Sequence, residues 1–280
     1  MFLLGGPFGT PTFDGTSRLV YRGMAKATQA LRPLAPGVPV QLPVEPDSAP
    51  LVRFDFDTRR LDTLGLLKVT RVDTKVSQGN SGALSIVMTI NPVPVVDDWA
   101  MLNDGSVAFV RGRDYHIDWL GRDGEWRSTP PVSFPWERFT DERRRAVLDS
   151  AERAVQRDRE RAAAMVGAVA SGGDAATRPG LPGKSLAPTI QLTPASELPD
   201  YVPAFVSGAA RGDAEGRLWV RTSATLNGGA VYDVFDRAGL LIDRIAVPPN
   251  RYIAGFAVGV VFMGVLDRDE ARLELARIRP

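Results

Sequence analysis

The chain has 280 residues, and its 34 Lys and Arg against 33 Asp and Glu give a net charge of +1 at pH 7. This balance excludes the broad positive potential by which proteins attract nucleic acid or anionic membranes. Cysteine is absent, so a disulfide, a thiolate metal site and a cysteine nucleophile are all excluded.

The N-terminal part of the chain predicts strands separated by one long loop. Residues 1–23 and 50–76 are rich in apolar and β-branched side chains and predict strands. Residues 24–49 are rich in proline and predict an extended loop. The opening residues lack the basic flank of a signal peptide, so we expect no export signal in this sequence. A further strand is expected over 84–90, and Asn91-Pro92 closes it.

The clearest strand pattern follows over residues 97–134. Two turn dipeptides, Asp104-Gly105 and Asp123-Gly124, separate runs that are rich in β-branched and aromatic side chains. The segment therefore predicts an order of strand, turn, strand, turn, strand. We expect an antiparallel sheet in which each strand pairs with its neighbour in sequence.

The only histidine of the chain, His116, lies in one of these predicted strands. Strand alternation places His116 and Asp118 on one face and the aromatic and aliphatic neighbours Tyr115, Ile117 and Trp119 on the other. A histidine can act as a general base or a metal ligand. Because no second histidine exists, we interpret His116 as a polar residue of the sheet face.

One strong helix is predicted over residues 140–169. Thr140 is a suitable N-cap, and Asp141-Glu142 stand where the helix dipole favours acids. An apolar stripe at helical spacing consists of Val147, Ala151, Ala154, Val155, Ala162, Met165, Val166 and Val169. The other faces carry arginines and acids in similar numbers, so the helix is no basic stripe for nucleic acid.

The helix and the segment after it interrupt the strand pattern. Residues 171–199 are rich in Pro, Gly and Ser and predict a tether back to the next strands. We therefore divide the chain into strands over 1–135, a helical insertion with its tether over 136–200, and strands over 201–280.

A unit of strand, glycine turn and strand recurs four times along the chain. Its turns contain Asp14-Gly15, Asp104-Gly105, Glu215-Gly216 and Gly259. The interval of 43 residues from Gly216 to Gly259 is that of one four-stranded propeller blade. We therefore predict an all-β fold: a β-propeller-like array of four-stranded antiparallel blades, about four of them recognisable, with one inserted α-helix. A β-sandwich also has short strands at regular spacing and is the alternative.

Several of these segments resemble a known family, the six-bladed β-propeller proteins of bacteria related to NHL-type repeats. The resemblance lies in residues 97–119, 130–132, 198–205, 216–220 and 232–236. Most such relatives have no assigned biochemical role, so the resemblance implies a fold and no particular chemistry. Relatives are longer at the N-terminus and begin with an export signal. By resemblance we expect a periplasmic or extracytoplasmic location and a chain shortened at its N-terminus.

No motif in the sequence defines a catalytic or metal site. The acid clusters Asp55-Asp57, Asp97-Asp98 and Asp267-Asp269-Glu270 lack the spacing of an EF-hand loop, and acids before turns are ordinary capping residues. The glycine-rich segments lack the lysine and helix of a phosphate loop, and no Gly-x-Ser-x-Gly elbow occurs. We therefore predict no catalytic residue, no cofactor and no bound metal.

The longest apolar run, residues 253–266, is shorter than the roughly 20 residues that span a bilayer, so no membrane span is predicted. The sequence favours a non-catalytic propeller scaffold or accessory subunit that docks on a partner protein or larger assembly. The alternative is a small-molecule binder, or a metal-dependent lactonase- or esterase-like hydrolase, with its site in the axial channel. The expected partner-binding residues lie on the insertion or beside it: Arg144, Arg153, Arg157, Trp136 and Tyr201.

Overall fold

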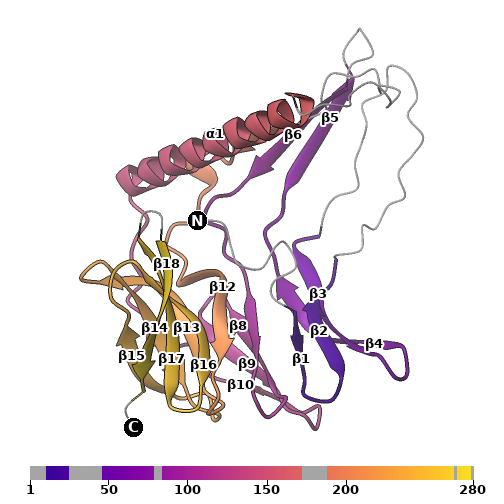
Figure 1. Ribbon diagram of the computed structural model, residues 1–280, viewed down its shortest axis with the longest axis vertical. Helices are drawn as coiled ribbons and strands as arrows, with labels where there is room; N and C mark the ends of the chain where they lie inside the picture. The colour runs from indigo at the N-terminus through magenta and orange to yellow at the C-terminus, as the bar shows by residue number, and fades with distance from the viewer. Residues whose placement is uncertain (1–10, 25–45, 79–83, 172–187, 268–269, 279–280) are drawn as a thin grey trace.

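The computed structural model describes residues 11–24, 46–78, 84–171, 188–267 and 270–278. These residues form a mostly β structure with one α-helix (Figure 1). This confirms the prediction of several four-stranded antiparallel sheets and a single long helix. Most of the predicted proline-rich loop, residues 25–45, lies outside the described residues, and the strand after it begins at Ser48.

Four antiparallel sheets follow one another along the chain, and each is a meander of neighbouring strands. Sheet 1 contains β1 (Thr12–Phe13), β2 (Arg18–Arg22), β3 (Ser48–Asp55) and β4 (Arg60–Lys68). Sheet 2 contains β7 (Asp98–Met101), β8 (Val107–Arg111), β9 (His116–Leu120) and β10 (Trp126–Ser128). Sheet 3 contains β12 (Phe205–Gly212), β13 (Leu218–Leu226), β14 (Gly229–Phe235) and β15 (Leu241–Ala246). Sheet 4 contains β16 (Arg251–Ala257), β17 (Val260–Asp267) and β18 (Glu270–Arg277).

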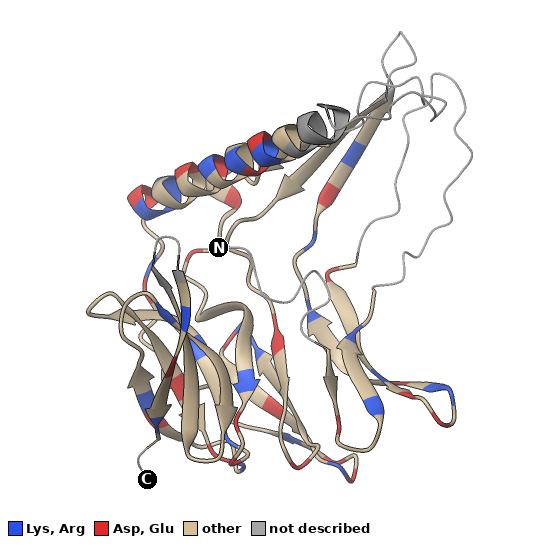
Figure 2. Cartoon of the chain, in the orientation of Figure 1, with Lys and Arg blue, Asp and Glu red and all other residues tan. Residues whose placement is uncertain are grey.

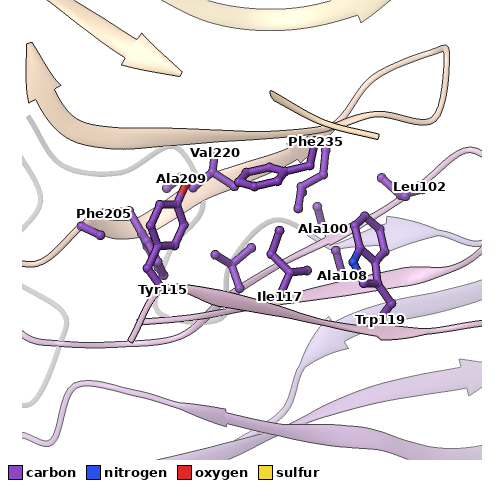
Figure 3. Close-up of a cluster of buried hydrophobic side chains, with 13 residues drawn as sticks. Ala100, Leu102, Ala108, Tyr115, Ile117, Trp119, Phe205, Ala209, Val220 and Phe235 are labelled. Atoms are coloured by element: carbon purple, nitrogen blue, oxygen red, sulfur yellow. The ribbon is translucent and has the colours of Figure 1, made fainter. Parts of the chain in front are cut away.

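The four sheets pack face to face in chain order. Val20, Leu51 and Leu67 of sheet 1 meet Trp99, Val107 and Phe109 of sheet 2. The other face of sheet 2 packs on sheet 3, where Ile117 and Trp119 face Phe205, Val220 and Phe235 (Figure 3). The far face of sheet 3 packs on sheet 4 through Trp219, Tyr232, Val234, Ile253 and Val261. Strands such as β8, which is apolar on both faces, are buried because they lie inside this stack.

The repeated turn glycines occupy equivalent places in the four sheets. Gly15, Gly105, Gly216 and Gly259 each lie between the first and the second strand of a sheet, and each has a positive φ, from 68° to 83°. Residues with a side chain rarely adopt this conformation, so the glycines mark where each hairpin turns. The sequence repeat therefore corresponds to a repeat of sheets.

A fifth sheet stands apart from the stack beside the helix (Figure 1). It contains β5 (Asp73–Gln78), β6 (Leu84–Ile90) and β11 (Thr189–Leu192), and β11 pairs parallel to β6. The strand β11 lies in the segment for which sequence analysis predicts only a tether. Its four residues, Thr-Ile-Gln-Leu, are a short alternating run, but its partner lies about a hundred residues earlier in the chain, so local sequence does not indicate the pairing.

The helix α1 (Asp141–Ser171) begins as predicted. The hydroxyl oxygen of Thr140 accepts a hydrogen bond from the backbone N–H of Arg143 at 3.3 Å, as an N-cap does. Val147, Ala151, Ala154 and Val155 are half-buried, whereas Ala162 is exposed. The side chains of Met165, Val166 and Val169 lie outside the described part of the chain. Figure 2 shows charges of both signs along the helix.

Candidate functional site

A cleft of about 490 Å³ lies where the first strands of the four sheets approach one another. Its wall includes residues from β1, β2, β7, β12 and β16, so every stacked sheet contributes to it. Its wall includes polar and charged residues, among them Thr12, Arg22, Asp98, Ser207 and Arg211. This cleft is the place where the fold brings together residues from the whole length of the described chain.

Asp98 is a buried acid of this cleft that accepts a hydrogen bond from a neighbouring sheet. Its carboxylate oxygen Oδ2 accepts a hydrogen bond from the backbone N–H of Ala210 at 2.8 Å, which joins sheet 2 to sheet 3. The register of β12 shifts just before Ala210, and Gly208 there has a φ of 84°. Burial raises the pKa of Asp98 to about 6, although the backbone hydrogen bonds and the charge of Arg22 oppose this rise.

Two half-buried arginines, Arg22 and Arg211, line the cleft. Arg22 ends β2, and burial lowers its pKa while the charge of Asp98 partly offsets that effect. Arg211 lies on β12. Within the described residues, neither guanidinium makes a hydrogen bond or an ion pair.

The other two carboxylates of the cleft wall are already paired. Asp97 accepts a hydrogen bond from Arg111 at 2.8 Å. Asp213, whose side chain is fully buried, accepts hydrogen bonds from the Arg217 Nε at 2.6 Å and from the Trp219 indole N–H at 2.8 Å. Among the described residues that line the cleft, the charged groups outside these pairs are therefore Arg22, Arg211 and Asp98.

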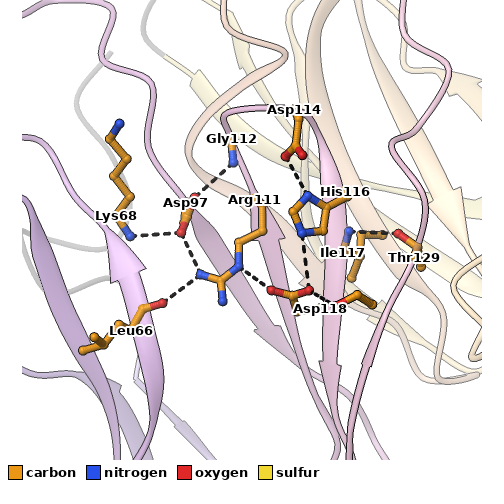
Figure 4. A network of polar contacts seen from close by, with 11 residues as sticks. Leu66, Lys68, Asp97, Arg111, Gly112, Asp114, His116, Ile117, Asp118 and Thr129 are labelled. Carbon is orange, nitrogen blue, oxygen red and sulfur yellow. Dashed lines mark hydrogen bonds and ion pairs between the residues drawn. The ribbon is translucent and has the colours of Figure 1, made fainter.

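A network of ion pairs connects sheet 1 to sheet 2 (Figure 4). Arg111 donates to Asp97, to Asp118 at 2.7 Å and to the carbonyl oxygen of Leu66 at 2.8 Å. Burial by itself would raise the pKa of Asp118, but hydrogen bonds from Ser128 and Arg111 outweigh it and lower the pKa. The network joins β4 to β8 and β9 through Arg111, so it stabilises the packing of the two sheets.

His116 belongs to the edge of this network. Its Nδ1 lies 2.6 Å from Asp114, and its Nε2 lies 3.3 Å from Asp118. The structure confirms that His116 and Asp118 share a face and that Ile117 and Trp119 point into the core on the other face. That His116 has no role beyond this polar face stays a prediction.

The structure places the expected partner-binding residues on the helix and beside its start. The side chain of Arg144 is only 17% exposed, and it donates to the carbonyl oxygen of Pro199 at 3.0 Å, so it fastens the start of the helix to the segment after it. Trp136 and Tyr201 are partly exposed near this point. Arg153 lines an open groove between the helix and β11, whereas Arg157 is simply exposed. Within the described residues, no ion pair or hydrogen bond joins Arg153 or Arg157 to the aromatic pair.

Two exposed apolar sheet faces, one at each end of the stack, were not predicted from the sequence. The face of sheet 1 that points away from sheet 2, which we call the sheet 1 end face, carries Phe13, Leu19, Phe54, Phe56, Leu61 and Leu66. Leu61 is 57% exposed and Leu66 is 58% exposed. The corresponding sheet 4 end face carries Tyr252, Phe262, Leu273 and Leu275, with Leu273 64% exposed. The apolar alternation of these strands indicates a buried face but cannot tell which faces remain uncovered.

Comparison of the chain with known protein families, with curated proteins and with solved structures found no match. Within the described ranges, no cluster of three or more His, Asp or Glu side chains is arranged to hold a metal ion. Among those same residues no helix has both the length and the apolar character needed to cross a membrane.

Proposed function

We propose that this chain is a non-catalytic, β-propeller-like scaffold that docks on a partner protein through the end faces of its sheet stack. The observation that carries the proposal is the exposure of large apolar side chains on both end faces. Each interior interface of the stack buries an apolar sheet face against another. The two end faces have the same chemistry and lack such a cover among the described residues.

Uncovered apolar area on this scale favours association. Burial of a leucine or phenylalanine side chain contributes about 1.5–3 kcal/mol. Each end face has two exposed leucines, Leu61 and Leu66 on sheet 1 and Leu273 and Leu275 on sheet 4, and their burial with the aromatic neighbours would favour binding. The occupant that fits is an antiparallel sheet of another polypeptide that is apolar on its contacting face. A partner sheet laid on either end would extend the radial order of the sheets around the cleft, as blades extend a propeller.

A photo-reactive phenylalanine analogue placed at Leu61 or at Leu273 tests this proposal in cells that produce the protein. We expect each position to give a discrete cross-linked adduct with a different polypeptide. The same analogue at the exposed turn residue Arg122 is the control and should give none. The analogue at Arg157 separates docking through the helix from docking through the sheets.

The proposal is wrong if no adduct forms at the end faces, or if the chain cross-links there only to copies of itself. An adduct at Arg157 alone would place the docking surface on the helix and would also contradict the proposal. Mass spectrometry of the adducts distinguishes these outcomes.

A further inference from the structure

We infer that the cleft between the four sheets binds a small anion, a carboxylate or phosphate group, through Arg22 and Arg211. This inference concerns the inside of the stack and does not depend on what covers the end faces. It rests on the position, burial and charge of the groups that form the wall of the cleft.

Partial burial of the two guanidiniums costs free energy, and a bound anion would offset that cost. Both side chains are half-buried, and a charge removed from water is destabilising unless a counter-charge or hydrogen bonds compensate it. Elsewhere in the stack the protein provides such partners, as it does for Arg111 with Asp97 and Asp118. The planar guanidinium fork matches the paired oxygens of carboxylate and phosphate groups.

Two of the three acids of the wall are already paired, and the third, Asp98, offsets part of the charge of Arg22. Asp97 and Asp213 are occupied by Arg111 and Arg217. Asp98 accepts a hydrogen bond from the backbone of β12, and its pKa of about 6 leaves it largely ionised at pH 7, so it partly balances Arg22. A metal ion would therefore have to displace the partners of Asp97 and Asp213, whereas an anion meets the guanidiniums of Arg22 and Arg211, which make no hydrogen bond within the described residues.

The remaining wall suits a small organic anion. The hydroxyl-bearing residues Thr12 and Ser207 line the cleft, and so do the aromatic residues Trp99 and Phe256. A volume of about 490 Å³ is within the usual range of small-molecule sites. We therefore expect a charged head group to bind the arginines while an apolar body lies against the aromatic wall.

Isothermal titration of the full chain with inorganic phosphate and with succinate tests this inference, and sodium chloride at equal ionic strength is the control. We expect saturable binding of at least one of the two anions, and the tighter one identifies the head group. Arg22→Gln and Arg211→Gln should each weaken binding about tenfold or more, because each removes a charge-assisted hydrogen bond. The matched variant Arg60→Gln changes an arginine that is 74% exposed outside the cleft and should bind as the native chain does.

Arg22→Lys and Arg211→Lys keep the charge and guard against loss of folding, which far-UV circular dichroism monitors. We expect folded Lys variants to bind more tightly than the Gln variants. The inference is overturned if neither anion binds saturably, or if folded Arg22→Gln and Arg211→Gln bind with native affinity.

Discussion

Buried carboxylates join neighbouring sheets at the scale of single residues. Asp98 on β7 accepts a hydrogen bond from the backbone N–H of Ala210 on β12. Asp233 on β14 accepts hydrogen bonds from the Tyr115 hydroxyl at 2.9 Å and from the Arg244 Nε at 3.1 Å. Burial raises the pKa values of both Asp233 and Tyr115. Because an unpaired buried polar group costs free energy, these bonds fix how one sheet lies on the next.

The raised pKa of Asp98 predicts a specific dependence of stability on pH. The folded chain keeps the proton up to about pH 6, whereas the unfolded chain releases it near 3.8, so ionisation of this group favours unfolding as the pH rises between these values. The effect is about 3 kcal/mol at about 1.4 kcal/mol per pKa unit. Asp98→Asn removes this pH-dependent effect. The difference in free energy of unfolding, variant minus native, should therefore increase by about 3 kcal/mol from pH 4 to pH 7.

Chemical denaturation of both proteins across this range measures the difference. Carboxylates with lowered pKa values, such as Asp104 and Asp118, act in the opposite direction, but they are present in both proteins and cancel. A difference that stays constant with pH would show that Asp98 does not ionise as described.

The hairpins are the elements whose construction local sequence specifies most directly. The turns at 102–106, 121–125, 213–217 and 236–240 share one geometry, in which the first residue donates its N–H to the carbonyl of the fifth. A glycine with φ between 80° and 86° stands fourth in each turn. Aspartates accept backbone N–H groups inside these turns, as Asp213 does from Glu215 and Arg217.

A matched pair of glycine substitutions separates the backbone effect from crowding. Gly124 has a φ of 86° and nothing within 4 Å of an added Cβ, so Gly124→Ala should cost about 1–2 kcal/mol through the backbone alone. Gly255 has equally open surroundings but no positive φ, so Gly255→Ala should change the stability by less than about 0.5 kcal/mol. Thermal and chemical unfolding measure both. Equal effects at the two positions would contradict the assigned turn geometry.

Elements that depend on distant partners could not be predicted in the same way. Asp-Gly turns, strand alternation around His116 and the N-cap at Thr140 are local, and the sequence predicts each of them correctly. The parallel pairing of β11 with β6 depends on tertiary contact. The roles of Asp98 and Arg211 in one cleft likewise depend on how β7 and β12 lie beside each other, for which no short motif exists. That Arg144 contacts a partner stays a prediction; its hydrogen bonds to Pro199 and Asp200, more than fifty residues away, are a further contact that no local pattern indicates.

At the scale of the whole molecule, four sheets form a stack that is well packed inside and apolar at both ends. The interior interfaces contain the largest buried side chains, such as Trp219, Phe109 and Phe205. The end faces repeat the same alternation of apolar residues, but their leucines and phenylalanines are exposed. This asymmetry between inside and ends is the observation on which the proposed docking of a partner sheet rests.

Because the chain contains no cysteine, single-cysteine variants test the central claim most directly. Leu61→Cys and Leu273→Cys should react rapidly with a soluble thiol reagent in the purified chain and slowly inside cells that produce the protein. Arg122→Cys, in an exposed turn, should react rapidly in both settings, and Ala108→Cys, fully buried between two sheets, slowly in both. Protection of both end-face positions in cells is the result that the docking proposal predicts. Equally rapid labelling of these positions in both settings would show that the end faces stay uncovered and would contradict it.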